Sequence, residues 1–317
     1  KMLKNLVERF SKENPDNISL VGPRYSGKSV FANAFVEELI KFEKNALLWD
    51  LRINTPQSDS EFFKQMTNEI VRSLPAESDD CEYLKSFEEN HYSELRDFFD
   101  EFKAPFILVM EGFDDLLATD HLSKNLWDNL LTLIKGPSCV MLTTSRKVLR
   151  ELIRSQETAG SLFWEAFDAN PIRMQPLSES DRQDFYDHLV DPAESVKSIL
   201  FESSGGFPPL FAHCLNAFFA ECPDALLAEI NRPEFLEQAF DEEAEQILEA
   251  IWNGLNVESK DFLIALKNAG KSGLSADNFN CKRGDLRDLE DLGFIKKGTT
   301  CYHISCFLLE EFLAEKS

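Results

Sequence analysis

The segment from Gly22 to Ser29, Gly-Pro-Arg-Tyr-Ser-Gly-Lys-Ser, has the residue types and the spacing of a phosphate-binding loop, GxxxxGK(S/T). An apolar run at residues 18–21 precedes it, and apolar residues at helical spacing follow at residues 30–40. A glycine loop between a strand and a helix turns backbone N–H groups and the positive end of the helix toward an anion. In that geometry Lys28 reaches the β- and γ-phosphates, and the Ser29 hydroxyl binds Mg²⁺. The sequence therefore predicts a nucleoside triphosphate site, contacted by Gly22, Pro23, Arg24, Tyr25, Ser26, Gly27, Lys28, Ser29 and Val30.

Acidic residues follow a second apolar run, where a phosphate loop needs a partner for its metal ion. Glu111 comes directly after the run at residues 106–110, and Asp114 and Asp115 follow three and four positions later. We expect Glu111 to hold Mg²⁺ through water, and Asp114 or Asp115 to orient the attacking water. A solvated acidic loop would have the same residue types. Its position after an apolar run, downstream of a phosphate loop, favours the catalytic interpretation.

Strands and helices that could position these residues alternate along the first part of the chain. Near-continuous apolar runs are typical of parallel strands that are covered on both faces. The predicted strands are residues 18–21, 46–51, 106–110, 139–144 and a shorter fifth at 172–174, and the predicted helices are residues 30–42, 61–74, 92–102 and 122–134. This alternation predicts a doubly wound α/β sheet that binds ligands at the carboxyl ends of its strands. Residues 74–90 are acidic and weakly periodic, so we expect a surface excursion there.

Strand signals nearly vanish beyond residue 178, where Ser178 or Ser180 could cap a helix at residues 181–189. Further helical patterns cover residues 192–202, 209–220, 242–255, 259–267, 284–292 and 307–314, with a short segment at 275–279 and a hairpin at 294–304 that turns near Gly298. Gly293 would end the helix at 284–292 in a left-handed conformation. Three helices and a hairpin are typical of a winged helix. The expected domains are a P-loop α/β domain at residues 1–177, a helical lid at 178–240 and a winged-helix domain at 241–317.

The acidic segment resembles the second motif of STAND-type signal-transduction ATPases, within the AAA+ group. Val-Met-Glu111-Gly112-Phe113-Asp114-Asp115 matches that motif, although the family usually has Asp at the position of Glu111. The longer Glu side chain changes the metal geometry that the family would provide. Ordinary AAA+ enzymes have a catalytic glutamate where this chain has Gly112, which favours the STAND assignment. The phosphate loop itself resembles the archaeal-ATPase branch of this group.

Three further segments resemble the family in the same order along the chain. Leu142-Thr-Thr-Ser-Arg146 is similar to the family's sensor, whose arginine would contact the γ-phosphate. Residues 172–178 are similar to the exit of the fifth strand into the lid. Gly206-Phe207-Pro208 is similar to the lid motif, which implies that Phe207 and Pro208 bind beside the adenine and ribose. The resemblance thus implies ATP or ADP with Mg²⁺ as ligands, and catalytic roles for Lys28, Glu111, Asp114, Asp115 and Arg146.

Composition limits the partners and the compartment. The chain has 33 Lys and Arg residues against 56 Asp and Glu residues, and its net charge of −23 disfavours non-specific nucleic-acid binding. Seven cysteines at irregular spacings form no disulfide framework, which is typical of a reducing cytoplasm. No apolar run approaches the ~18 residues of a membrane span. We therefore expect a cytoplasmic protein without a membrane partner.

The predicted helix at residues 284–292 bears on the partner of the winged helix. In a DNA reader this helix would enter the major groove. Its polar residues are four acids and one base, namely Asp285, Asp288, Glu290, Asp291 and Arg287. Such a helix would meet phosphates poorly, although Lys282, Arg283, Lys296 and Lys297 could still contact a DNA backbone. We therefore expect this domain to serve as a lid or to bind a protein.

These features predict an ATP-binding, slowly hydrolysing molecular switch that controls the assembly or activity of a partner protein. The sequence shows no protease, nuclease or deaminase signature, so the output would come from a partner or from self-assembly. A prokaryotic defence or regulatory complex fits by analogy. One alternative is an initiator- or loader-type AAA+ ATPase that binds DNA through its winged helix. Another is a scaffold that binds nucleotide without hydrolysing it.

Overall fold

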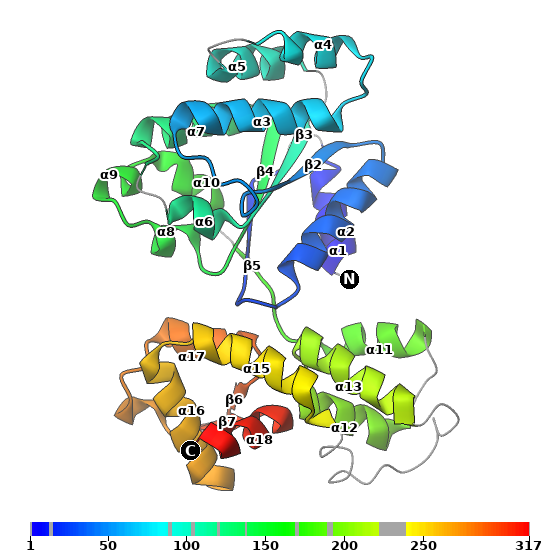
Figure 1. Ribbon diagram of the computed structural model, residues 1–317, viewed down its shortest axis with the longest axis vertical. Coiled ribbons are helices and arrows are strands. Elements are labelled where there is room, and N and C mark those ends of the chain that lie inside the picture. Colours follow the sequence, from blue (N-terminus) through cyan, green and yellow to red (C-terminus); the bar gives the residue numbers. More distant parts are fainter. Residues whose placement is uncertain are drawn as a thin grey trace. The chain divides into compact units, whose positions relative to one another are not determined.

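The structure, a computed structural model, describes residues 2–12, 15–87, 91–102, 105–118, 121–136, 138–168, 171–188, 193–221 and 239–316 (Figure 1). The chain divides into two compact units. Unit 1 comprises residues 1–21 and 28–173, and unit 2 comprises residues 22–27 and 174–317. Among the described residues, no helix combines the length and the apolar composition that crossing a membrane requires.

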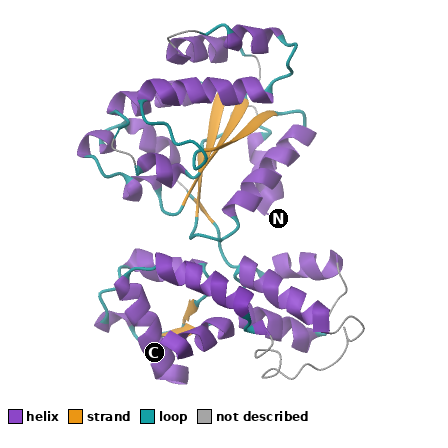
Figure 2. Cartoon of the chain, viewed as in Figure 1, coloured by secondary structure: helices purple, strands orange, loops and turns teal. Residues whose placement is uncertain are grey.

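Unit 1 is built around a five-stranded sheet with helices on both faces (Figure 2). Its strands are β1 Ile18–Val21, β2 Asn45–Asp50, β3 Phe106–Glu111, β4 Cys139–Ser145 and β5 Ile172–Arg173. Its helices are α1 Met2–Phe10, α2 Lys28–Lys41, α3 Asp59–Ser73, α4 Asp79–Lys85, α5 His91–Glu101, α6 Phe113–Leu117, α7 Lys124–Lys135, α8 Leu149–Leu152, α9 Gln156–Ala159, η1 Leu162–Trp164 and α10 Glu165–Asp168. The strand order is β2-β3-β4-β1-β5, and every neighbouring pair is parallel. The predicted parallel α/β sheet is confirmed.

Strand β3 shows why these segments read as continuous apolar runs. Phe106, Leu108 and Met110 belong to the large core cluster that also includes α3, α5 and α7. Ile107 and Val109 are equally buried, and strand alternation points them to the opposite face, where Figure 1 shows α1 and α2. Both faces are therefore covered, and the strand has no solvent side that polar residues could occupy.

The register of the sheet aligns the strand ends that matter for a ligand. Asp50 at the end of β2 lies opposite Glu111 at the end of β3, and Val21 at the end of β1 lies opposite Ser145 on β4. Glu111 is thus the last residue of β3 rather than the first residue after it. The Leu51 N–H continues the ladder by donating to the Glu111 carbonyl over 3.0 Å.

The segment at residues 74–90, expected to be a surface excursion, contains a short helix that the sequence did not predict. Residues 79–85 form α4, capped by the Ser78 hydroxyl, which accepts the Cys81 N–H over 3.2 Å. Cys81 and Leu84 are its buried side chains. Seven residues make only about two helical turns, which is too short for hydrophobic periodicity to identify a helix. The other described elements of unit 1 that the patterns did not predict are α1, α6, α8, α9, η1 and α10, most of them five residues or shorter.

Unit 2 is mainly helical. Its elements are α11 Glu179–His188, α12 Glu194–Ser204, α13 Pro208–Glu221, α15 Glu242–Gly254, α16 Val257–Ala269, η2 Gly270–Ser272, η3 Ala276–Asn278, α17 Arg283–Asp291, β6 Ile295–Lys297, β7 Tyr302–Ile304 and α18 Phe307–Lys316. Strands β6 and β7 form the expected antiparallel hairpin, and Gly298 donates to the Cys301 carbonyl over 2.7 Å at its turn. The Ser178 hydroxyl accepts the Asp181 N–H over 3.2 Å, so Ser178 caps α11. The predicted helix start at Pro192 lies outside the described residues.

Two glycines join the ends of α12 and α17 inside unit 2. Gly205 and Gly293 both have positive φ, 62° and 71°. A Cβ on Gly205 would lie 2.0 Å from the Gly293 carbonyl oxygen, and a Cβ on Gly293 would lie 2.1 Å from the Gly205 carbonyl oxygen. Only glycine allows the two backbones to approach this closely. Helices α12, α13, α15, α16 and α18 contribute to one apolar core around this contact, while the predicted division between residues 240 and 241 stays a prediction.

Candidate nucleotide-binding site

The glycine loop at residues 22–27 has the backbone of a tight anion-binding turn. Gly27 has φ 86° and Tyr25 has φ 65°, both in the left-handed region. At Gly22 a Cβ would lie 2.8 Å from the Met174 Cβ and 2.9 Å from the Ser26 Oγ, so only glycine fits there. The Ser26 Oγ is buried and has no hydrogen-bond partner among the residues that the structure describes. This loop therefore has the geometry that the motif predicts, with a buried hydroxyl whose hydrogen-bonding capacity is unused.

Helix α2 begins at Lys28, directly after the loop, so Lys28 and Ser29 lie in its first turn. The first N–H groups of a helix and its positive end attract an anion at this position. Burial lowers the pKa of Lys28 from 10.5 to about 8, because desolvation disfavours its charged form; Asp114 and Glu111 oppose this effect. Val30, another predicted contact, is 75% exposed. A half-buried lysine and an exposed apolar residue thus lie two positions apart at the start of α2.

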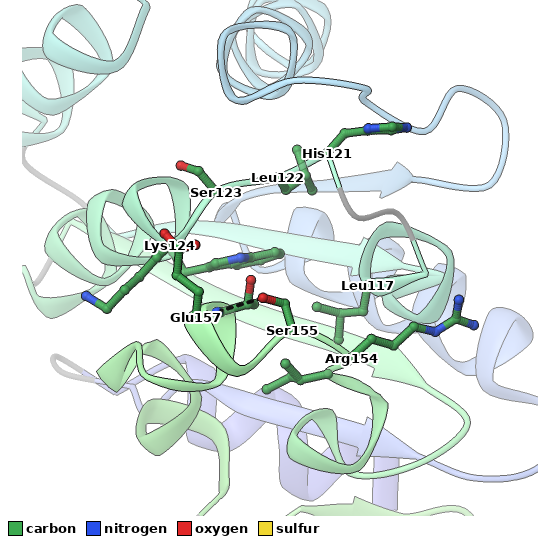
Figure 3. A pocket seen from close by; sticks show the side chains of 11 residues that line it. Leu117, His121, Leu122, Ser123, Lys124, Arg154, Ser155 and Glu157 are labelled. Carbon is green, nitrogen blue, oxygen red and sulfur yellow. Dashed lines mark hydrogen bonds between the residues drawn. The ribbon is translucent and has the colours of Figure 1, made fainter.

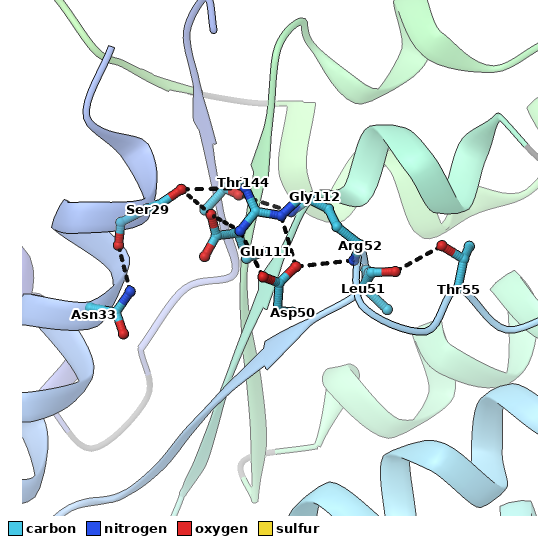
Figure 4. A network of polar contacts seen from close by, with 9 residues as sticks. All are labelled: Ser29, Asn33, Asp50, Leu51, Arg52, Thr55, Glu111, Gly112 and Thr144. Carbon is cyan, nitrogen blue, oxygen red and sulfur yellow. Dashed lines mark hydrogen bonds and ion pairs between the residues drawn. The ribbon is translucent and has the colours of Figure 1, made fainter. Parts of the chain in front are cut away.

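Glu111 is buried and is joined to the Ser29 hydroxyl, which donates to Glu111 Oε1 (Figure 4). The same oxygen lies 2.9 Å from Nη2 of Arg52. The two side chains that the sequence proposed as Mg²⁺ ligands, 82 positions apart, therefore meet in the fold. Hydroxyl and carboxylate oxygens are the ligands that Mg²⁺ prefers. The donor set fits the ion, with Ser29 and Glu111 as the residues that would hold it.

Asp114 links the ends of β3 and β4 through Arg146. Its carboxylate accepts the Arg146 backbone N–H at 2.9 and 3.0 Å from its two oxygens, and Arg146 Nε lies 3.2 Å from Oδ1. Asp114 is buried, whereas the Arg146 side chain is 44% exposed. Thr144 adds a second link, since its Oγ1 accepts the Gly112 N–H over 3.2 Å. Arg146 is thereby fixed at the carboxyl end of β4, next to an acid that the sequence placed near the nucleotide.

Asp115 follows Asp114 on α6 and is only half-buried. The hydrogen bond to Asp50 is the main cause of the raised pKa of Arg52, and the negative charge of Asp115 makes a small further contribution. Asp114 and Asp115 were interchangeable in the sequence, but the structure gives them different surroundings. The Asp114 carboxylate accepts hydrogen bonds from the backbone N–H and the guanidinium of Arg146, whereas Asp115 is more exposed to solvent.

The sequence analysis missed Asp50 and Arg52. Asp50 ends β2 and accepts hydrogen bonds from Arg52 Nε at 2.8 Å and Arg52 Nη2 at 2.6 Å, which lower the pKa of the Asp50 carboxyl. The signal that found Glu111, an acid at the end of an apolar run, applies equally to Asp50. Arg52 has no comparable signal, because an arginine two positions after a strand is ordinarily a solvated residue.

The predicted lid residues lie in unit 2. Phe207 is fully buried, and its ring centroid lies 6.1 Å from that of Phe294. Pro208 begins α13 and is half-buried. The Leu177 N–H donates to the Gly206 carbonyl over 2.8 Å, which connects the start of unit 2 to this motif. Phe207 is therefore a core residue of its own unit, and the nucleotide contacts of Phe207 and Pro208 stay predictions.

A separate cavity of about 230 Å³ in unit 1 lies between α7 and the segment around α8 and α9 (Figure 3). Its lining includes Trp127, whose buried Nε1 has no hydrogen-bond partner among the described residues. Its polar lining comes from Ser123, Lys124, Arg154 and Ser155, among others. No predicted site residue belongs to the lining of this cavity, so it is distinct from the strand ends described above.

No protein-family model and no curated protein matches this sequence. Solved structures do match its fold. The Walker-type ATPase PABY2304 of Pyrococcus abyssi is 15% identical with a TM-score of 0.60, over 98% of this chain and 93% of that chain. The ORC2 protein of Aeropyrum pernix, as ADPNP–ADP complexes, is 12% identical with a TM-score of 0.55, over 99% of this chain and 92% of that chain. Its ADP form has a TM-score of 0.51. The chain therefore shares its overall α/β fold with this Walker-type ATPase and with this ORC2 protein.

Proposed function

We propose that this protein is an ATP-binding, slowly hydrolysing switch that controls the assembly or the activity of a partner protein. The observation that carries the proposal is the contact between Ser29 and Glu111, which joins the two expected Mg²⁺ ligands at the carboxyl edge of a parallel sheet. Burial lowers the pKa of Lys28, and the negative charges of Asp114 and Glu111 both act against this effect, so Lys28 interacts with both acids. Support also comes from structural neighbours described as a Walker-type ATPase and as ADPNP–ADP and ADP complexes.

The residues divide into binding and hydrolytic roles. The loop at residues 22–27 and Lys28 would bind the phosphates, and Ser29 and Glu111 would hold Mg²⁺, which offsets phosphate charge when bound. Asp114 keeps Arg146 at the end of β4, where the arginine would contact the γ-phosphate. Asp115, the more open of the two aspartates, would align the attacking water. Turnover would be slow, because Gly112 stands where ordinary AAA+ enzymes have a catalytic glutamate.

Loss of the γ-phosphate would remove charge-assisted hydrogen bonds from Lys28 and Arg146, and this difference between ATP and ADP drives the switch. The output would pass to a partner protein or to self-assembly through the helical and winged-helix elements of unit 2. A STAND-type identity, a cytoplasmic location and a role in a prokaryotic defence or regulatory complex belong to the same proposal.

The test is the affinity for fluorescent ADP in the presence of Mg²⁺. We expect Lys28→Ala to weaken binding about 100-fold, because the phosphates lose their charge-assisted bonds. Lys41→Ala is the matched control, since Lys41 lies at the exposed far end of the same helix, and its affinity should equal that of the unchanged protein. Unaltered affinity in a folded Lys28→Ala protein would remove the proposal. Binding without any turnover would instead support the scaffold alternative.

A second candidate function, DNA binding through α17 and β6, is favoured by one observation. Of the four acids that weigh against DNA binding, Asp285 and Asp291 are buried, whereas Asp288 and Glu290 are half-buried. The Asp285 carboxylate accepts the Lys282 N–H over 3.2 Å at the helix start, so it caps the helix instead of facing solvent. The basic residues Lys282, Arg283, Arg287, Lys296 and Lys297 are all exposed. These exposed bases would therefore attract phosphates despite the overall charge of −23.

A further inference from the structure

Arg52 contacts both residues that would hold Mg²⁺. Its Nη2 lies 2.9 Å from Glu111 Oε1, and its Nη1 lies 3.5 Å from the Ser29 Oγ (Figure 4). The oxygen that Nη2 contacts is the one that accepts the Ser29 hydroxyl. A cationic side chain of the protein is therefore bonded to the same two oxygen donors that a metal ion would use.

Asp50 holds Arg52 in this position independently of Glu111. The Asp50 carboxylate accepts Arg52 Nε at 2.8 Å and Nη2 at 2.6 Å, and it also accepts the Arg52 backbone N–H at 3.0 Å. A forked guanidinium contact of this kind fixes both direction and distance. Arg52 can therefore lose Glu111 and Ser29 while it remains bonded to Asp50.

Gly112 provides the space for the arginine. A Cβ on Gly112 would lie 2.5 Å from Arg52 Cγ and 2.9 Å from Arg52 Cδ, so any side chain there would displace the stem of Arg52. Gly112 also has φ 74°, which other residues adopt only with strain. The residue directly after the predicted metal ligand thus admits the arginine that reaches that ligand.

We propose that Arg52 competes with Mg²⁺ for Glu111 and Ser29, and so sets the metal concentration at which the site fills. Mg²⁺ requires its oxygen ligands at about 2.0–2.1 Å, and a guanidinium bonded to the same oxygen would then be close enough to repel the ion strongly. Metal entry therefore requires Arg52 to release Glu111 and turn within its contact to Asp50. The Arg52 side chain is 46% exposed, which leaves it free to make this movement. This inference rests on the proposed function only in that the metal would accompany the nucleotide.

Two titrations of the full chain test the competition. The first measures Mn²⁺ binding without nucleotide by electron paramagnetic resonance, for the unchanged protein, Arg52→Ala and Arg52→Gln. The second fixes fluorescent ADP and titrates Mg²⁺. We expect the Mn²⁺ dissociation constant and the Mg²⁺ midpoint to fall roughly fivefold in both variants, the size expected for a partly exposed ion pair. Arg52→Gln keeps hydrogen-bond donors without the charge, so it covers the case in which Arg52→Ala does not fold.

Arg72→Ala is the matched control, because Arg72 forms an ion pair with Glu69 on the surface of the same unit. Its Mn²⁺ dissociation constant and its Mg²⁺ midpoint should equal those of the unchanged protein. Metal affinity that is unaltered or weaker in the Arg52 variants would overturn the proposal, and weaker affinity would show that Arg52 supports the metal ligands. Absence of ADP binding by the unchanged protein would count against the nucleotide function alone. The Mn²⁺ comparison would still decide the role of Arg52.

Discussion

The strand ends of unit 1 and the α17–β6 segment of unit 2 both contain buried acids and more exposed bases, but the buried acids have different partners. At the strand ends, Glu111 and Asp114 are buried and each is bonded to a more exposed arginine. On α17, Asp285 and Asp291 are buried, and no acid on that helix is left fully exposed. The bases there face solvent.

The difference shows that the count of charges in a segment does not determine what a ligand meets. At the strand ends, Glu111 is bonded only to the side chains of Ser29 and Arg52 among the printed contacts of its carboxylate, and a metal ion could replace these contacts. On α17 the buried Asp285 carboxylate accepts the Lys282 backbone N–H at the start of the helix, so it caps the helix. The first region is thus suited to a cation and the second to an anion.

Asp115→Asn should produce the largest effect in either region. We expect the hydrolysis rate to fall about 100-fold while ADP affinity stays the same, because the neutral amide aligns the attacking water less well than the carboxylate does. A phosphate-release assay at saturating ATP measures the rate. Asp97→Asn, which alters an exposed carboxylate on α5, is the control and should leave the rate unaltered. A normal rate in Asp115→Asn would assign water alignment to another residue.

Asp114→Ala should destabilise the strand ends by about 2 kcal/mol, because the Arg146 backbone N–H loses its acceptor. Arg146→Ala should cost less than about 1 kcal/mol, since it removes only a partly exposed side-chain contact and leaves the backbone bond in place. Urea unfolding without nucleotide or metal measures both variants. Equal costs would mean that the guanidinium, and not the backbone bond, holds the two strand ends together.

Charge reversal on α17 should weaken DNA binding about tenfold. The change is Lys282→Glu/Arg283→Glu/Arg287→Glu. We expect the slope of log affinity against log salt to decrease in magnitude by up to about 3, because binding releases fewer counterions when fewer phosphates are contacted. Labelled duplex DNA is titrated at several salt concentrations. The control Lys64→Glu/Arg72→Glu/Lys85→Glu makes the same change of charge at exposed positions of unit 1. If both triple variants lost the same DNA affinity, the loss would be due to net charge, and α17 would have no specific role in DNA binding.

Asp285→Ala should produce the smallest effect, a loss of about 1 kcal/mol in unfolding free energy, because the Lys282 N–H loses its acceptor at the start of α17. Asp285→Asn retains an oxygen acceptor and should cost less than half as much. Thermal unfolding compares the two variants. A neutral Asp285→Ala variant would show that the carboxylate is buried without serving as a cap.

The sequence identified most of the strand-end site because that site follows simple local rules. The glycine loop, the lysine and serine after it, and the acid that ends an apolar run are all defined by neighbours in the chain. Strands β1 to β4 matched their apolar runs within one residue at either end, because strands covered on both faces contain little else. Arg52 escaped detection, since its importance depends on Asp50 and Glu111, which come together only through the register of β2 and β3.

The sequence by itself determined a parallel α/β sheet with a phosphate-binding loop, because local patterning and glycine conformation specify both. The tertiary structure alone decided which charges are buried and which partners they have. It joined Ser29 to Glu111, placed Arg52 on the same oxygen and buried two of the four acids of α17. The physical reason is that burying a charged group is costly unless it is paired, and each partner comes from a residue that only the fold brings near.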